Sequence, residues 1–180
     1  MDYGLTIEER ERLTLLATYL DKLPADYQDF NMGHFFLGKT CDGSGELARQ
    51  YALHNGGVAS CGTAACAIGH GPSAGILVPE SLITQKSRLD SFEWEIDWWG
   101  YSLLFTGLLE HRALLFDWMF GEGWRWADNH HYSAAARIKY VLAGEVIPDK
   151  LNQYHGMVGA RDLYAKYNQL EAMSETSDGL

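Results

Sequence analysis

Cysteine is scarce in this 180-residue chain, which contains only Cys41, Cys61 and Cys66. An odd number of cysteines at these spacings does not form a disulfide framework, and no basic and apolar leader precedes them. We therefore expect free or metal-bound thiols and a cytoplasmic location. No run of about eighteen apolar residues occurs either, so the sequence predicts no membrane-spanning segment.

Basic residues are also few, with 14 Lys and Arg against 24 Asp and Glu, which gives a net charge of −10. Direct binding to nucleic-acid phosphates needs clustered Lys and Arg, so this function is not expected. The glycines do not form a phosphate-binding loop, and no Cys-x-x-Cys motif is present. The acidic balance is compatible with a plain soluble protein or with docking on a basic surface of a partner.

Helical patterns dominate what the chain does contain, and they predict one mainly α domain over residues 1–173 with a disordered tail at 174–180. The clearest helix begins after Thr6, because Thr6 and Glu9 have the spacing of a capping box. The apolar residues that follow have the spacing of one helical face: Leu13, Leu16, Ala17 and Leu20. Pro24 prevents the helix from continuing.

Further short helices, joined by long ordered loops, are predicted over residues 46–54, 63–68, 104–119 and 158–172. Gly121 is expected to end the third of these. Residues 124–131 are interpreted as an aromatic and polar connection. After it, Ser133 is expected to cap a helix that Gly144 and Pro148 end.

Residues 92–98 alternate between apolar and acidic side chains, which is the period of a half-buried β-strand. No partner strand is recognisable, so an extended arm or an irregular helix is an alternative. In an extended segment, Glu93, Glu95 and Asp97 lie on one face about 6.6 Å apart. Three aromatic residues accompany them: Trp98, Trp99 and Tyr101. Together these residues are a candidate surface that binds an arginine-rich protein or imitates nucleic acid. The alternative is a solvated strand face with inward-packed aromatic rings.

The segment Cys61–Ala65 carries a second candidate chemistry. Cys61 stands where a helix is predicted to begin, and a helix N-terminus lowers the pKa of a thiol. These five residues resemble the nucleophile region of papain-like and bacteriocin-processing peptidases, and the resemblance implies a thiol hydrolase. Such a hydrolase also needs a base, a residue that orients the base, and an oxyanion donor. The candidates are His130, His131 or His155 as base, Asn129 or Asn152 as orienting residue, and Gln50 as oxyanion donor. The alternative is a buried helix of small residues.

The same segment offers weak candidates for a metal site: Cys61, Cys66 and His70. A fourth ligand could come from Cys41 or His54. Paired ligands at tight spacing are absent, and Gly69 is expected to break the helix before His70. We therefore expect no metal and no other cofactor, with a zinc-stabilised structural domain as an alternative.

Three stretches together resemble a family of uncharacterised small proteins from bacteriophages and bacterial genomes. They are the Cys-Gly-Thr-x-x-Cys-x-x-Gly-His stretch at 61–70, the segment 118–124, and the segment 134–148. The resemblance covers about residues 58–148 and implies a phage-related setting in the host cytoplasm, without an activity. Small acidic phage proteins often bind host machinery. We therefore expect a non-enzymatic interaction or inhibitor module that binds a basic protein surface, with the thiol hydrolase as the second hypothesis.

Overall fold

The computed structural model describes residues 2–28, 30, 32, 66–88, 91–107, 113–121, 124 and 128–147. Within these residues the chain is mainly α-helical, as the sequence predicts, and it has one small antiparallel sheet. The α-helices are α1 (Ile7–Asp21), α3 (Trp98–Thr106), α4 (Ala113–Phe120) and α6 (His131–Leu142). The strands are β1 (Ile83–Arg88) and β2 (Ser91–Ile96), preceded by the short 3-10 helices η1 (Ile68–His70) and η2 (Glu80–Leu82). The helices predicted at 46–54 and 158–172 and the tail at 174–180 lie outside the described residues.

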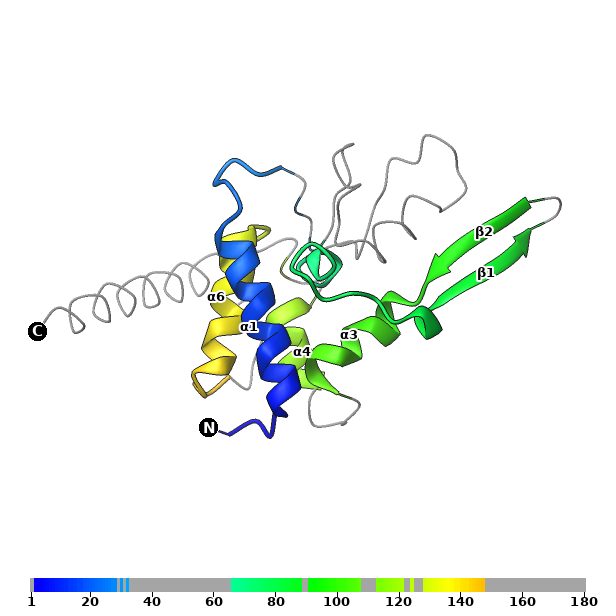
Figure 1. Ribbon diagram of the computed structural model, residues 1–180. Coiled ribbons are helices and arrows are strands. Elements are labelled where there is room, and N and C mark those ends of the chain that lie inside the picture. The colour runs from blue at the N-terminus through cyan, green and yellow to red at the C-terminus, as the bar shows by residue number, and fades with distance from the viewer. Residues whose placement is uncertain are drawn as a thin grey trace, which may run out of the picture.

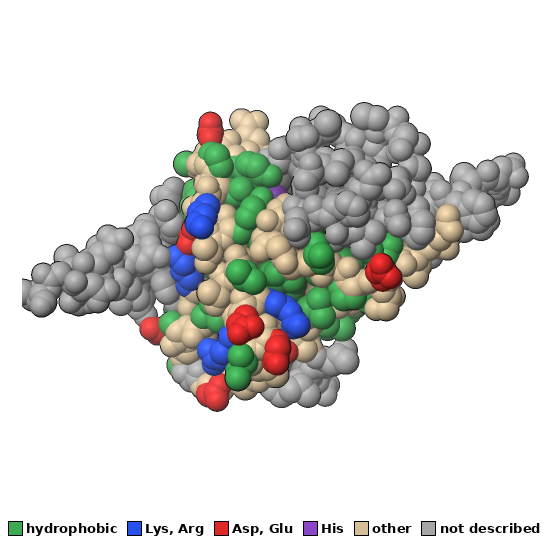
Figure 2. All heavy atoms as spheres, viewed as in Figure 1, with side chains coloured by type: hydrophobic (Ala, Val, Ile, Leu, Met, Phe, Trp, Pro, Cys, Tyr) green, Lys and Arg blue, Asp and Glu red, His purple; other side chains and the backbone are tan. Residues whose placement is uncertain are grey.

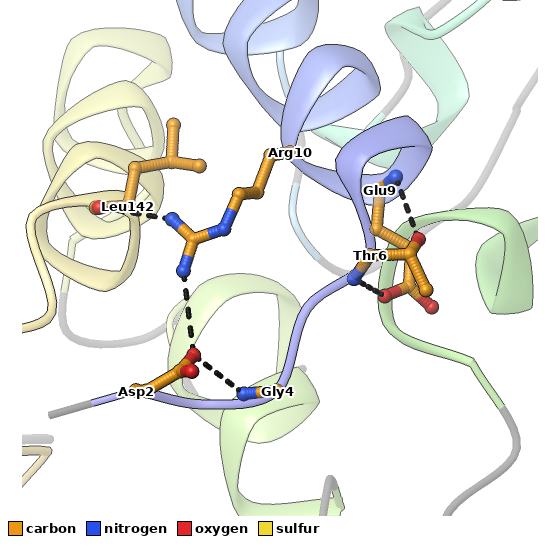
Figure 3. Close-up of polar contacts among 6 residues, drawn as sticks. All are labelled: Asp2, Gly4, Thr6, Glu9, Arg10 and Leu142. Atoms are coloured by element: carbon orange, nitrogen blue, oxygen red, sulfur yellow. Dashed lines mark hydrogen bonds and ion pairs between the residues drawn. The ribbon is translucent and has the colours of Figure 1, made fainter.

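Helix α1 begins at the predicted capping box. The Thr6 hydroxyl accepts a hydrogen bond from the Glu9 amide at 3.2 Å, and the Glu9 carboxylate accepts one from the Thr6 amide at 2.8 Å (Figure 3). The guanidinium of Arg10 joins this end of the chain to α6, because it donates to the Leu142 carbonyl at 3.4 Å and lies 3.6 Å from the Asp2 carboxylate. The predicted apolar stripe of α1 is fully buried. The prediction for this helix is therefore confirmed.

Helix α6 packs against α1 and α4 in the helical body (Figure 1). Its consecutive alanines at 134–136 are all buried, since small side chains let the neighbouring helices approach closely. Gly144 has a φ of 73° and ends the helix, as predicted. The prediction that Ser133 is the N-cap is wrong: His130 occupies the cap position and Ser133 lies buried in the first turn.

Helices α3 and α4 replace the single helix predicted over 104–119. The Asp97 side chain caps α3 by accepting a hydrogen bond from the Gly100 amide at 2.8 Å. Gly107, with a φ of 68°, ends the helix, because a left-handed residue cannot continue a right-handed one. Gly121 ends α4 as expected, and its amide donates to the Asp117 carbonyl at 3.0 Å. No helix in the described ranges is both long enough and apolar enough to cross a bilayer.

The two strands form a hairpin that extends away from the helical body, with its base next to α3 (Figure 1). Ile83 and Ile96 are opposite each other at this base, and Ile96 is buried. The Asp97 amide donates to the Leu82 carbonyl at 2.8 Å, so η2 is held against the start of α3. Figure 2 shows an acidic side chain exposed at the base of the hairpin, and mixed charges over α1. The predicted strand near 92–98 is confirmed for 91–96, and β1 is the partner that was not recognised.

Candidate functional site

The base of the hairpin gathers exposed acidic residues from three elements. Glu80 belongs to η2, Glu95 to β2, and Asp97 to the cap of α3. All three are exposed, and the backbone bond between Asp97 and Leu82 holds η2 beside the start of α3. Trp99, in the first turn of α3, is 60% exposed. We call Glu80, Glu95, Asp97 and Trp99 the hairpin-base patch.

The acidic strip expected along one strand face takes a different form. Asp97 is not part of β2, because its side chain caps α3 and its backbone has left the strand. Glu93 and Glu95 do belong to β2, but the ladder places Glu93 opposite Lys86 of β1. Among the hairpin residues whose side chains are described, the exposed acidic ones lie at its base.

The three aromatic residues expected on this surface have different surroundings. Tyr101 is fully buried, and its hydroxyl donates to the Ile76 carbonyl, so the prediction that it lines the surface is wrong. Trp98 is half-buried, with its ring edge-on to that of Tyr101 at 5.7 Å. Trp99 alone among them is largely exposed, and its ring meets Phe116 edge-on at 5.4 Å. The contact with Phe116 orients an aromatic side chain that stays open to a partner.

The cysteine segment is described only from Cys66 onward, so Cys61 lies outside the described residues. The same is true of Cys41, His54, Gln50, Asn152 and His155, and of most of the helix predicted at 63–68. Gly69 does not interrupt the helical backbone before His70, contrary to expectation. The 3-10 helix η1 spans Ile68–His70, and the His70 amide donates to the Cys66 carbonyl at 3.1 Å. Cys66 is a free, buried thiol. It has the surroundings of a packing residue.

Burial raises the pKa of the Cys66 thiol to about 11, from an ordinary value of 9.0. We expect native Cys66 at pH 8 to react with iodoacetamide at least about a hundredfold more slowly than after unfolding, because the thiolate is the nucleophile. Between about pH 9 and 11 the thiol loses its proton in the unfolded chain but keeps it in the folded one. The free energy of unfolding should therefore fall as the pH rises over this range. Mass spectrometry of alkylated native protein at pH 8 measures the first trend, and rapid labelling would contradict it. Urea denaturation at several pH values between 7 and 11 measures the second.

The adjacent histidines at the start of α6 have different surroundings. His130 is exposed and its ring stacks on Tyr132 at 4.9 Å. His131 is buried, with Nδ1 2.8 Å from the Leu20 carbonyl oxygen and Nε2 2.9 Å from the Pro24 carbonyl oxygen. Asn129 accepts a hydrogen bond from the Met32 amide at 2.8 Å. His131 and Asn129 thus hold backbone groups of the α1 end and its following loop, and His130 is the histidine of the pair whose ring is open to a thiol.

His70 lies in an aromatic cluster that also receives His131. The His70 ring stacks on Phe30 at 5.8 Å and meets Tyr27 edge-on at 5.7 Å. His131 meets the same two rings edge-on at 6.2 Å each. Within the described ranges, no three His, Cys, Asp or Glu side chains are grouped so that they could hold a metal ion. The described part of the segment packs into the core and supplies no complete ligand set.

Two notable residues in different parts of the fold, Glu80 and Arg137, are not predicted from the sequence. Glu80 belongs to the patch because it lies just before β1. The sequence did not indicate this position, because β1 lacks the alternation of apolar and polar side chains that reveals β2. Arg137 is buried inside α6, with its guanidinium carbon 4.1 Å from the centre of the Trp124 ring. A charged residue beside the apolar positions 134, 138 and 141 was the available signal, since buried arginines are rare without a specific role.

Comparison of the chain with protein-family models, with curated proteins and with solved structures finds no match.

Proposed function

We propose that the protein is a non-enzymatic interaction module of the cytoplasm, which binds a basic surface of another protein through the hairpin-base patch. The observation that carries this proposal is the exposure of Trp99 and of three carboxylates on elements that meet at the base of the hairpin. Tryptophan is enriched in the energetic centres of protein interfaces. Carboxylates around it pair with arginines of a partner and exclude acidic competitors.

The net charge of −10 supports the same kind of partner, because a chain of this charge attracts basic surfaces over longer range. The patch then supplies the specific contact. Trp99 meets Phe116 of α4, and Asp97 is held by its capping bond to Gly100, so two of the four residues are oriented before a partner arrives. Residues that are already ordered lose little conformational entropy on binding.

The proposal is tested with a fluorescent deca-arginine peptide in an anisotropy titration at 50 and 200 mM NaCl. The variant E80Q/E95Q/D97N removes three charges from the patch, and Asn at 97 retains a good helix cap. We expect it to bind about tenfold more weakly than the wild type at 50 mM NaCl and to show a smaller salt dependence, since each rim charge contributes about 0.2–1 kcal/mol.

The matched control is E8Q/E11Q/D26N, which removes three exposed carboxylates from α1 and the turn after it. This control has the same net charge as the patch variant, and it should bind within about twofold of the wild type. Equal weakening in the two triple variants would mean that the peptide responds to net charge alone, which contradicts a patch. Cys61→Ser should leave the titration unchanged, whereas loss of a measurable turnover in that variant would support the thiol hydrolase instead.

A further inference from the structure

The hairpin of β1 and β2 has two strand edges. Within the described residues the sheet consists of these two strands alone, so each of them is an edge strand. Figure 1 shows that the hairpin extends past the described helices, with only its base beside α3. A hairpin of two strands is marginally stable in water, and a third strand stabilises it. Each outer edge is therefore a place where another extended segment can pair.

The hydrogen-bonding pattern of the ladder identifies the backbone groups at these edges. The Asp97 amide donates to the Leu82 carbonyl at 2.8 Å, so positions 82 and 97 continue the register as a hydrogen-bonded pair. Such pairs alternate along an antiparallel ladder with pairs whose N–H and C=O groups point away from the other strand. Beyond the buried Ile96 at the base, the outward groups belong to Phe92 and Trp94 of β2 and to Gln85 and Ser87 of β1. No described residue outside the hairpin makes a backbone hydrogen bond with them.

The two edges differ in charge. β1 contains Lys86 and Arg88, whereas β2 contains Glu93 and Glu95 and leads directly into the hairpin-base patch. A basic segment is therefore attracted to the edge of β2 and repelled by the edge of β1.

We propose that a basic segment of the protein partner adds to β2 as a third, extended strand. This inference rests on the proposed function and specifies how the partner is bound. The N–H and C=O groups of Phe92 and Trp94 pair with the backbone of the added segment, and its basic side chains are attracted by the acidic residues of β2 and of the hairpin-base patch. In strand addition the main-chain bonds supply affinity and the side chains supply specificity.

The test uses the peptide acetyl-Thr-Arg-Val-Arg-Val-Arg-Thr-amide, because Val and Thr favour an extended backbone. NMR follows amide hydrogen exchange in the ¹⁵N-labelled full-length protein. At saturating peptide, exchange at Phe92 and Trp94 should slow at least about tenfold, since a hydrogen-bonded amide exchanges only when the structure opens. Exchange at Gln85 and Ser87, the matched positions on the edge of β1, should change by less than about twofold.

A second measurement removes hydrogen-bond donors without changing the charge. The same peptide N-methylated at every internal residue should bind at least about tenfold more weakly in an anisotropy titration. Trp94→Pro removes an outward N–H from β2 and should also weaken binding, whereas Trp94→Thr keeps this N–H and measures the effect of losing the indole. Gln85→Pro is the matched control, because Gln85 stands opposite Trp94 in the ladder and its outward N–H belongs to the other edge.

The exchange measurement uses the wild-type chain, so it is decisive even when a proline variant does not fold. Peptide binding that depends on the patch charges but leaves exchange at Phe92 and Trp94 unchanged would overturn strand addition and leave the proposed function intact. Slowed exchange at these two residues, with equal weakening in the two triple variants, would support strand addition and contradict the patch. Slowed exchange that appears without peptide and increases with protein concentration would assign the edge to a second copy of this chain and overturn the proposal.

Discussion

Replacement of Trp118 by alanine is expected to lower the free energy of unfolding by about 3–5 kcal/mol. Trp118 is fully buried in α4, where its ring meets Trp124 edge-on at 5.5 Å and Tyr140 of α6 at 5.4 Å. Removing the indole leaves a cavity between these helices that α6, packed on both sides, cannot close. A domain of this kind has a free energy of unfolding of about 5–15 kcal/mol, so the substitution removes a large fraction of the total stability.

Urea denaturation followed by far-UV circular dichroism measures this loss, and Trp99→Ala is the control of identical chemistry. Because Trp99 is 60% exposed, its loss should change the free energy of unfolding by less than about 1 kcal/mol. The proposed function adds a second readout, since Trp99→Ala should weaken deca-arginine binding at least about threefold while the protein stays folded. A Trp118→Ala protein as stable as the wild type would contradict the central position of this ring.

Replacement of His131 by alanine is expected to lower the free energy of unfolding by about 3 kcal/mol. The imidazole contacts the Leu20 and Pro24 carbonyl oxygens, and it packs on Tyr27 and Phe30. Alanine leaves two carbonyl groups without this partner and opens a gap in the aromatic cluster. The junction between the end of α1 and the start of α6 should therefore lose protection in hydrogen exchange before the hairpin does.

His131→Phe separates the two contributions, because it keeps a ring but offers no nitrogen to the carbonyl groups. It should recover part of the loss, about 1 kcal/mol, and leave the hydrogen-bonding part. His130→Ala is the control one residue away, where the ring is exposed and stacks on Tyr132. Its free energy of unfolding should stay within about 0.5 kcal/mol of the wild type. Equal losses at 130 and 131 would contradict the structural role assigned to His131.

The candidate site was predictable only in its components. The alternation over 92–98 revealed a strand and its acidic positions, because a half-buried strand has a period of two that is visible in one segment. It did not reveal that Asp97 leaves the strand to cap α3, or that Lys86 stands opposite Glu93. Tyr101 was misplaced on the surface for the same reason, since its burial depends on contact with the Ile76 carbonyl rather than on its neighbours in sequence.

Local information in the sequence determined the helical class of this protein, the capping box and apolar stripe of α1, and the endings at Gly121 and Gly144. These features depend on residues within about one or two turns of each other, so they can be read without knowing the fold. Tertiary structure decided the start of α6 at His131, the partner strand β1, and the burial of Arg137 beside Trp124. Each of these joins residues that lie close only after folding, and the free energy of such contacts overrides the weak preferences of a short segment.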